Sequence, residues 1–278
     1  MLFYEYLSSL EAKSEPFAIV TVIKASENSP GRTAFKMCVT TDGQIVGSVG
    51  GGSLEYGAKN EALEMLRTGE RTRVVKYFLK DKEDGGNGMA CGGEAELLIE
   101  TVMPRPHLYI FGGGHIGSTL TRYAADVGFD VTVIDDRPAF ASAEAHPQAS
   151  ACRLIDSYDD VERLTFVKDA YFVIVTHQHV GDGATLRGLL RHDDLDAKYI
   201  GMIGSAKKLA RVFRDMMAAD IPEEKLRFVH APIGIDHGGQ SANEIAISIA
   251  AELIAARNGR ELADSCAAKK HPLNQPIA

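Results

Sequence analysis

The feature that most constrains this chain is the segment from His107 to Asp135, which reads as strand, glycine turn, helix and strand. The apolar run His107–Phe111 leads into Gly112-Gly113-Gly114-His115-Ile116-Gly117, which matches G-x-G-x-x-G. Asp135 follows at about the 20-residue spacing typical of an acidic ribose-binding residue. Because helix N-termini bind phosphates, the pattern predicts a Rossmann-like domain with a nucleotide site at the turn.

Each glycine of this pattern has a physical role: Gly112 permits a tight turn, Gly114 lets the backbone approach a pyrophosphate, and Gly117 lets helix and strand pack closely. Asp135, which ends the second strand, is expected to accept a hydrogen bond from a ribose hydroxyl, with the adjacent Asp136 as an alternative. An acid here, with Arg137 nearby, favours a 2′-hydroxyl over a 2′-phosphate on the ribose. A vestigial site, or one for another ligand, remains the alternative. The candidate nucleotide-binding residues are Gly112, Gly114, His115, Gly117 and Asp135.

Beyond Asp135, short apolar runs alternate with helix-length segments. Tyr171–Val175 is apolar throughout, as expected of a strand covered on both faces, and Lys198–Ile203 repeats the pattern. Helices are expected over Ser205–Met217 and Ser241–Arg257. This alternation predicts an α/β fold with a doubly wound parallel sheet over residues 107–258, followed by a flexible tail over residues 259–278.

The connector Pro104-Arg105-Pro106 separates this domain from an N-terminal half of different character. Residues 1–103 are expected to form a small α+β domain. An Asp-Gly hairpin turn is expected over Thr41–Gln44. The predicted strands are 17–23, 37–40, 73–78 and 95–100, and the predicted helix covers 54–67.

Two histidines follow the apolar strand at 171–175, at the sheet edge where open α/β sheets place ligands. His177 and His179 are candidates for metal ligands or for a general acid or base, and ordinary polar loop residues are the alternative. Two further segments are candidate site loops; a plain strand–helix turn explains the first equally well, and an ordinary connector is the alternative for the second. They are Gly201–Ser205, a potential anion site, and the glycine-rich His230–Gly239.

The N-terminal half contains its own glycine run, Gly50-Gly51-Gly52-Ser53, at the start of the predicted helix. Successive glycines let backbone N–H groups turn inward and bind an anion, and Ser53 is expected to cap the helix. The functional interpretation is a cradle for a phosphate or a polar heterocycle. The alternative is a tight turn that needs positive φ angles.

Cys91, in Gly88-Met89-Ala90-Cys91-Gly92-Gly93, is the thiol that stands apart from the other three. Its glycine-flanked loop predicts an accessible sulfur, soft enough to bind molybdenum or to carry sulfur, with a structural cysteine as the alternative. No neighbouring histidine forms the nucleophile–base pair of a cysteine hydrolase. Cys38 and Cys152 are expected to be packing residues, and no role is assigned to Cys266.

Composition excludes several classes of protein. Acidic residues exceed basic ones, 38 against 30, for a formal charge of −8, which argues against nucleic-acid and membrane-surface partners. Four scattered cysteines do not form a disulfide framework and favour a reducing compartment. With no basic secretory leader and no long apolar span, we expect a cytoplasmic protein.

Together these segments resemble the XdhC/CoxI family of xanthine dehydrogenase accessory proteins. The resemblance runs in order over residues 10–257. In the first half it depends on Ser29-Pro30-Gly31-Arg32, Lys36-Met37, Gly47–Glu55 and Cys91-Gly92-Gly93. In the second half it depends on Gly112–Gly117, Tyr199–Ser205, Ala231–Asp236 and Glu244-Ile245-Ala246.

The resemblance implies a chaperone that binds molybdenum cofactor (molybdopterin) as cargo, assists its sulfuration and inserts it into a molybdenum hydroxylase of the xanthine dehydrogenase type. It implies Cys91 as the residue that holds the molybdenum, with a cofactor sulfurase and the hydroxylase as partners. Bound NAD(P) or another nucleotide and a homodimer are further expectations.

This chain departs from the family pattern at Ala34 and at His237–Gln240, which affects the detailed choice of ligand. Two other functions stay open. One is an NAD(P)-dependent oxidoreductase with His177 or His179 as the proton donor. The other is a non-enzymatic nucleotide-sensing partner protein.

Overall fold

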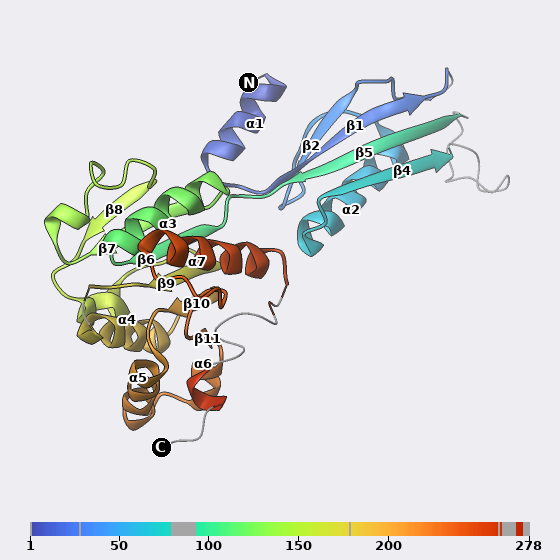
Figure 1. Cartoon of the computed structure of the whole chain (residues 1–278). Coiled ribbons are helices and arrows are strands. Elements are labelled where there is room, and N and C mark those ends of the chain that lie inside the picture. Colours follow the sequence, from blue (N-terminus) through green and yellow to red (C-terminus); the bar gives the residue numbers. More distant parts are fainter. Residues whose placement is uncertain are drawn as a thin grey trace. The chain divides into compact units, whose positions relative to one another are not determined.

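The computed structural model describes residues 2–27, 29–78, 93–177, 179–260, 262 and 271–274 (Figure 1). The chain divides into two units, Met1–Pro104 and Arg105–Ala278, at the proline-containing connector. Each unit has hydrophobic clusters of its own. No helix in the described part of the chain is both long and apolar enough to cross a lipid bilayer.

The first unit is built on a five-stranded antiparallel sheet in the order β3-β2-β1-β5-β4. The Asp-Gly hairpin turn predicted at Thr41–Gln44 is confirmed, since it joins two strands that pair antiparallel, and Gly43 has a φ of 80°. The strands are β1 (Phe17–Ala25), β2 (Lys36–Thr40), β3 (Ile45–Gly47), β4 (Thr72–Phe78) and β5 (Glu94–Val102).

One face of this sheet packs against helix α2 (Gly52–Thr68), whose Leu54, Ala58 and Met65 are fully buried. The strands contribute alternate residues such as Val20 and Leu97 to this core. The alternation follows from the two-residue period of a strand, which directs every second side chain to one face. The opposite face carries a smaller cluster that includes residues of α1 (Phe3–Ala12).

The second unit contains six parallel strands in the order β11-β10-β9-β6-β7-β8. This is the strand order of a doubly wound dinucleotide-binding sheet, so the predicted fold class is confirmed. The strands are β6 (His107–Phe111), β7 (Asp130–Asp135), β8 (Ala151–Leu154), β9 (Ala170–Ile174), β10 (Ala197–Met202) and β11 (Val229–His230).

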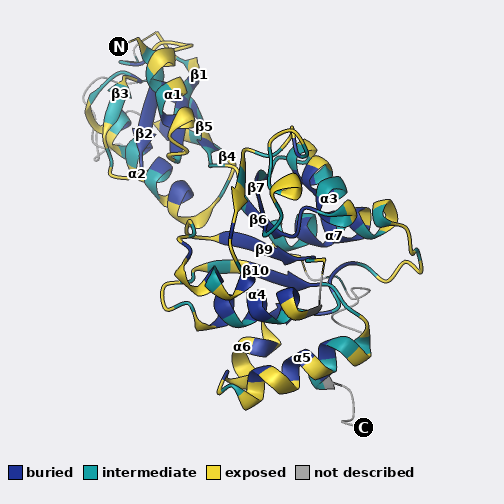
Figure 2. Cartoon of the chain, turned by 90° about the vertical axis from the view of Figure 1, so that its left-hand side faces the viewer, coloured by how far each residue is buried: buried dark blue, intermediate teal, exposed yellow. Residues whose placement is uncertain are grey.

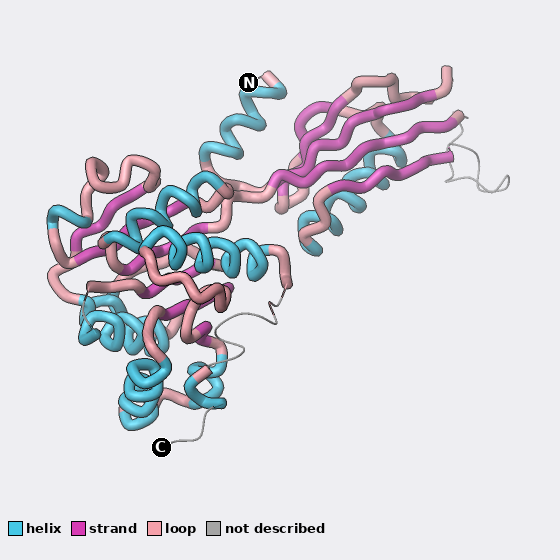
Figure 3. The backbone as a smooth tube through the Cα atoms, in the orientation of Figure 1, coloured by secondary structure: helices cyan, strands magenta, loops and turns pink. Residues whose placement is uncertain are grey.

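Helices cover both faces of the parallel sheet (Figure 3). Helices α3 (His115–Asp126) and α7 (Ala242–Arg257) pack together on one face, and α4 (His179–Arg191) and α5 (Ala206–Ala218) lie on the other. The short α6 (Glu223–Arg227) precedes β11. Because both faces are covered, the central strands are buried almost throughout (Figure 2), as their uninterrupted apolar sequences predict.

The structure differs from the sequence-based expectation at the C-terminus. A flexible tail is predicted over residues 259–278, but His271 and Pro272 are buried, and Leu273 packs against the core next to α5. His271 Nε2 lies 3.0 Å from the carbonyl oxygen of Val229, and its ring contacts Phe213 edge-on. These contacts bind the short 3₁₀ turn Pro272–Asn274 to the Rossmann-like domain.

Candidate functional site

The glycine turn lies at the point where the order of the parallel sheet reverses. β6 runs between β7, which follows it in sequence, and β9, which the chain reaches only after crossing back over the sheet. In open α/β sheets ligands bind outside the carboxyl ends of the strands at such a switch point. Residues 112–117, 136–137 and 175–177 directly follow the carboxyl ends of these three strands, and Asp135 is the last residue of β7.

Two glycines of the turn are required by packing. Gly112 has a φ of 108°, and a Cβ there would lie 2.4 Å from the carbonyl oxygen of Val175. A Cβ on Gly117 would lie 1.8 Å from the carbonyl oxygen of Gly112. The tight turn and the close approach of α3 to β6 therefore depend on these glycines, as their predicted roles require.

Gly114 is different, because it faces open space. It is the N-cap of α3, its backbone is extended, and no atom of the described residues lies within 4 Å of a Cβ built on it. No side chain in the described part of the chain caps this helix start, and the adjacent His115 is exposed. The first N–H groups of α3 can therefore bind a phosphate that approaches the glycine closely.

Asp135 is placed differently from a ribose-binding acid. It is fully buried, and its Oδ1 accepts hydrogen bonds from Arg137 N–H at 3.0 Å and Arg137 Nε at 2.8 Å. Its Oδ2 accepts from Gly113 N–H and from Arg137 Nη2, each at 2.8 Å. Burial raises the pKa of Asp135, but the hydrogen bonds from Arg137 and Gly113 outweigh it and hold the pKa below its usual value. This geometry does not support the prediction that Asp135 accepts a ribose hydroxyl, because both oxygens are already engaged.

The segment after β7 folds back over the glycine turn. The guanidinium carbon of Arg137 lies 3.9 Å from the centre of the Phe140 ring. The carbonyl oxygen of Phe140 is 2.9 Å from His146 Nε2. The same carbonyl oxygen would be only 2.1 Å from a Cβ on Gly113. Gly113 is thus required by this packing, a role that the G-x-G-x-x-G pattern alone does not predict.

The side chain of Asp136, the residue after Asp135, approaches His177. Its Oδ1 lies 3.7 Å from Nδ1 of His177, and both side chains are slightly more than a quarter exposed. One ligand atom from each of Asp135, Asp136 and His177 lies within 4.8 Å of the other two. The structure therefore brings His177, a sequence-predicted candidate, next to the glycine turn.

The loop that carries His177 is fixed by a buried carboxylate. Asp182 Oδ1 accepts hydrogen bonds from Thr176 N–H at 3.0 Å and from the Thr176 hydroxyl at 2.7 Å. Asp182 is 1% exposed and forms an ion pair with Lys208 of α5. His179 is the first residue of α4, and its side chain lies outside the described part of the structure.

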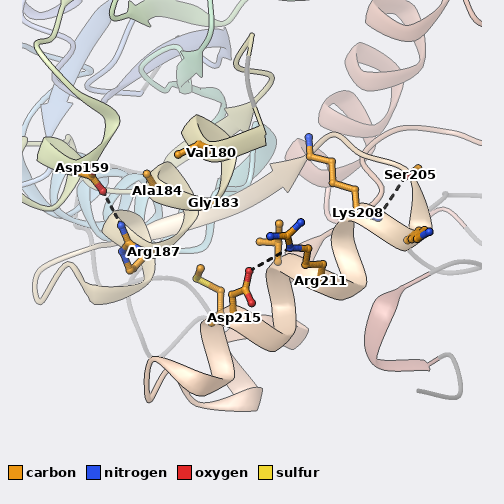
Figure 4. A pocket seen from close by; sticks show the side chains of 12 residues that line it. Asp159, Val180, Gly183, Ala184, Arg187, Ser205, Lys208, Arg211 and Asp215 are labelled. Carbon is orange, nitrogen blue, oxygen red and sulfur yellow. Dashed lines mark hydrogen bonds and ion pairs between the residues drawn. The ribbon is translucent and has the colours of Figure 1, made fainter. Parts of the chain in front are cut away.

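A groove of about 620 Å³ lies between α4 and α5, with Ala184 and Val212 among the apolar residues of its lining (Figure 4). Its cationic side chains are largely paired, since Arg187 Nη2 lies 2.6 Å from Asp159 and Arg211 lies 4.0 Å from Asp215. Ser205, from the candidate anion loop Gly201–Ser205, lines the groove and caps α5 by accepting a hydrogen bond from Lys208 N–H.

The second predicted site loop, His230–Gly239, is attached to α7 by a buried carboxylate. Glu252 is 3% exposed, accepts a hydrogen bond from Gly234 N–H, and lies 2.6 Å from His230 Nδ1. Tyr199 packs against the His230 ring, with the ring centres 4.4 Å apart. The sequence offers no signal for Glu252, which lies among apolar residues in the second half of α7.

The N-terminal glycine run forms a turn in which Gly50, Gly51 and Gly52 all have positive φ. A Cβ on Gly50 would lie 2.5 Å from the backbone of Gly31, so the segment containing the Ser29–Arg32 motif packs against this turn. The expectation that Ser53 caps the helix is wrong. Gly51 is the N-cap and Ser53 lies inside the first turn, because α2 begins two residues earlier than predicted.

Part of this turn is occupied by the protein's own polar groups. Glu55 Oε2 accepts hydrogen bonds from the Ser48 hydroxyl at 2.7 Å and from Val49 N–H at 3.4 Å, and Gly50 N–H donates to Ser48 Oγ. Gly51 faces space that no described residue fills, because a Cβ at this position would have none of their atoms within 4 Å. The open part of the cradle is therefore at Gly51 and the start of α2.

The structure describes two of the four cysteines, Cys38 and Cys152. Cys91 and the adjacent Gly92 lie outside the described residues, as does Cys266. Cys38 is fully buried, and burial raises its pKa to about 11, as expected of a packing thiol. Cys152 is partly buried, and burial raises its pKa as well.

Comparison with known protein families gives matches in both halves of the chain. Residues 10–77 match the family described as XdhC and CoxI, and residues 108–253 match the XdhC Rossmann domain. A crystal structure described as a xanthine dehydrogenase from Bacillus halodurans has the same fold, with a TM-score of 0.52 and 22% sequence identity over 97% of this chain and 99% of that chain.

Two curated relatives are longer than this chain. The uncharacterised protein YqeB of Escherichia coli is 28% identical over 252 residues, which are 90% of this chain and 45% of that protein. A probable xanthine dehydrogenase subunit of Bacillus subtilis is 29% identical over 163 residues, 58% of this chain and 46% of that protein. The chain thus spans about half the length of the curated relatives it matches.

Proposed function

This chain belongs to the XdhC and CoxI family, and we propose that it is an accessory protein that binds molybdenum cofactor and assists its sulfuration and insertion into a molybdenum hydroxylase. The hydroxylase is of the xanthine dehydrogenase type. The Bacillus subtilis relative, described as part of a probable xanthine dehydrogenase, supports this choice of client. A cofactor sulfurase and a second copy of the chain are further partners in the proposal.

One observation carries the proposal. In each domain of this chain, a helix begins at a glycine that has open space beside it. Among the residues that the structure describes, Gly51 at α2 and Gly114 at α3 both leave space where a side chain would stand, and both helices begin without a side-chain cap. Molybdopterin carries a phosphate, and its dinucleotide forms carry a pyrophosphate. Uncapped helix N-termini with space for close approach suit such anionic groups.

The glycines of the second domain also fit the phosphates of NAD(P), the cofactor that its fold implies. The acid at the end of β7 does not fit the ribose, because Asp135 is buried and already accepts four hydrogen bonds. We therefore favour a phosphate-bearing ligand whose binding does not depend on Asp135.

The proposal is tested by mixing purified protein anaerobically with molybdenum cofactor and measuring molybdenum that coelutes on gel filtration. Wild type is expected to retain the cofactor, and Cys91→Ala to lose most of it, because the thiolate is the soft ligand for molybdenum or its sulfur. Cys152→Ala is the matched control, since that thiol is partly buried in the Rossmann-like domain. Equal retention by Cys91→Ala, or no retention by wild type, contradicts the proposal.

One observation favours a second candidate, an NAD(P)-dependent oxidoreductase. His177 lies next to the glycine turn, where a proton donor for such a reaction would stand. A panel of small alcohols and carbonyls, assayed for change in NAD(P)H absorbance, separates the two functions. Turnover that disappears in His177→Gln supports the oxidoreductase, whereas absence of turnover together with cofactor retention supports the accessory protein.

A further inference from the structure

Two polar atoms near the switch point are buried without a hydrogen-bond partner among the described residues. They are Oδ1 of Asp136, directly after β7, and the hydroxyl of Tyr158, which begins the 3₁₀ turn Tyr158–Arg163. Tyr158 is only 4% exposed. A buried polar atom left unpaired costs about 1–3 kcal/mol, and more when it is charged, so these atoms indicate a missing binding partner.

His177, in the loop after β9, brings a third group to the same place. Its Nδ1 lies 3.7 Å from the unpaired Asp136 oxygen. A carboxylate oxygen only accepts, and a neutral imidazole nitrogen without hydrogen also accepts. Acceptors that face each other in this way are suited to binding one cation between them.

The separation of these two atoms fits a single metal ion. Bonds of about 2.1 Å to nitrogen and oxygen place two ligand atoms 3.7 Å apart when the angle at the metal is about 120°. This angle is compatible with tetrahedral or five-coordinate geometry. Both side chains are slightly more than a quarter exposed, so other coordination positions remain open to solvent or to a ligand.

The charges nearby also leave Asp136 without a full partner. Arg137 is closer to Asp135, with which it makes two side-chain hydrogen bonds of 2.8 Å, than to Asp136 Oδ1, which lies 3.8 Å from Arg137 Nε. The guanidinium charge is therefore balanced by Asp135. Asp135 itself is not a metal ligand in this arrangement, because both of its oxygens accept two hydrogen bonds.

Tyr158 is an observation independent of the Asp–His pair. Its ring packs close to Gly181 in the first turn of α4, since a Cβ on Gly181 would lie 2.9 Å from it. The same Cβ would also lie 2.9 Å from the hydroxyl oxygen of Thr176, the residue before His177, so the Tyr158 ring packs beside the loop that carries His177. A neutral hydroxyl at this position can donate to a metal-bound water or phosphate.

We propose that Asp136 and His177 bind a divalent transition-metal ion at the switch point of the sheet, with Tyr158 orienting a further ligand of that ion. The mixed nitrogen and oxygen donors favour Mn²⁺, Co²⁺ or Zn²⁺ over Mg²⁺ and Ca²⁺. The metal site does not depend on the proposed function. Only the additional step, in which a phosphate bound at α3 completes the coordination, rests on it.

The test uses the full chain without an affinity tag, in a Cys91→Ser background so that this thiol does not bind the probe. Mn²⁺ binding is followed by loss of the free-ion electron paramagnetic resonance signal, and Co²⁺ binding by visible absorption. We expect one saturable site, and at least tenfold weaker binding in both Asp136→Asn and His177→Gln. Asp160→Asn, at a more exposed acid of the same domain, is the matched control and should bind as the parent does.

Circular dichroism melting shows whether each variant is folded. If one of the two site variants does not fold, the other alone tests the proposal. The proposal is overturned if the parent has no saturable site for either ion, or if the folded site variants bind them unchanged. Failure of the wild-type chain to retain molybdenum cofactor, with Mn²⁺ still bound by the Cys91→Ser parent, would instead contradict the proposed function alone. The two failures are therefore distinguishable.

Discussion

At the scale of single residues, the glycine turn contains positions with opposite tolerance for a side chain. Gly117 is in contact with the backbone of Gly112, whereas Gly114, three residues earlier, faces open space. Both match the same sequence pattern, and only their surroundings distinguish a glycine needed for folding from one available for ligand binding. Paired alanine substitutions therefore separate these two roles.

We predict that Gly117→Ala lowers the free energy of unfolding of the Rossmann-like domain by about 1–3 kcal/mol, because its Cβ would overlap a carbonyl oxygen. Gly114→Ala should change that free energy by less than about 1 kcal/mol, since the φ of −67° at this position suits alanine. The added Cβ should weaken binding of pyrophosphate and NAD⁺ at least tenfold, because it would block the close approach of a phosphate to the backbone at the start of α3. Urea unfolding and calorimetry measure the two effects.

The control for this pair is Gly183→Ala, at a helical glycine in α4 that also has open space around it. It should leave ligand affinity unchanged and should not destabilise the domain. If Gly114→Ala binds pyrophosphate as well as the parent does, the helix start of α3 is not the phosphate site.

The site also shows which residue roles a sequence can indicate. The spacing of the glycines locates the turn, and a position after an apolar strand locates His177 at the ligand-binding edge. The saturation of Asp135 by Arg137 depends on side-chain orientation, which no spacing specifies. Tyr158 and Asp182 have ordinary sequence surroundings and reach the site only through the tertiary fold.

At the scale of elements, strands and helices with strong periodicity are predictable, and short or less regular ones are not. β9 and α5 follow from uninterrupted apolar residues and from one apolar helical face, respectively. β8 has mostly exposed side chains, and β11 has only two residues, so neither produces a recognisable apolar run. α1 is short and contributes only two buried residues, Leu7 and Leu10.

Helix α7 provides a prediction at this scale, because it is apolar on most sides and its start is fixed by a capping box. Ser241 Oγ accepts a hydrogen bond from Glu244 N–H, while Glu244 Oε2 accepts from Ser241 N–H at 3.0 Å. Ser241→Ala should lower the free energy of unfolding of this domain by about 1 kcal/mol. Ser150→Ala, at an exposed position of the same domain, should have no measurable effect.

The measurement is denaturant unfolding followed by circular dichroism, with both variants compared in the same transition. A Ser241→Ala variant as stable as Ser150→Ala would show that tertiary packing, rather than the cap, determines where α7 begins.

At the scale of the whole molecule, the C-terminal contacts predict a dependence of stability on pH. Burial lowers the pKa of His271 and also that of His107, against the opposing effect of Asp130. Below the unfolded value of about 6.5, the unfolded chain therefore binds more protons than the native one. Stability contributed by these histidines is complete above that pH and is lost as the pH falls through 6.5 and below.

Urea unfolding at pH 7.5 and pH 5.5 checks this expectation for the Rossmann-like domain. His271→Gln, which retains a hydrogen-bond donor for the Val229 carbonyl, should reduce the difference between the two pH values. An undiminished difference in that variant would assign the pH dependence to groups other than the C-terminal histidine.

The order of strands in the first unit has a consequence for synthesis of the chain. Its sheet is completed by β5, which pairs with both β1 and β4 and ends at Val102, before β6 begins at His107. Every strand of that sheet is therefore synthesised before the first strand of the parallel sheet. Since domains emerging first tend to fold first, the antiparallel unit can complete its hydrophobic core while the slower-forming parallel sheet is still being translated.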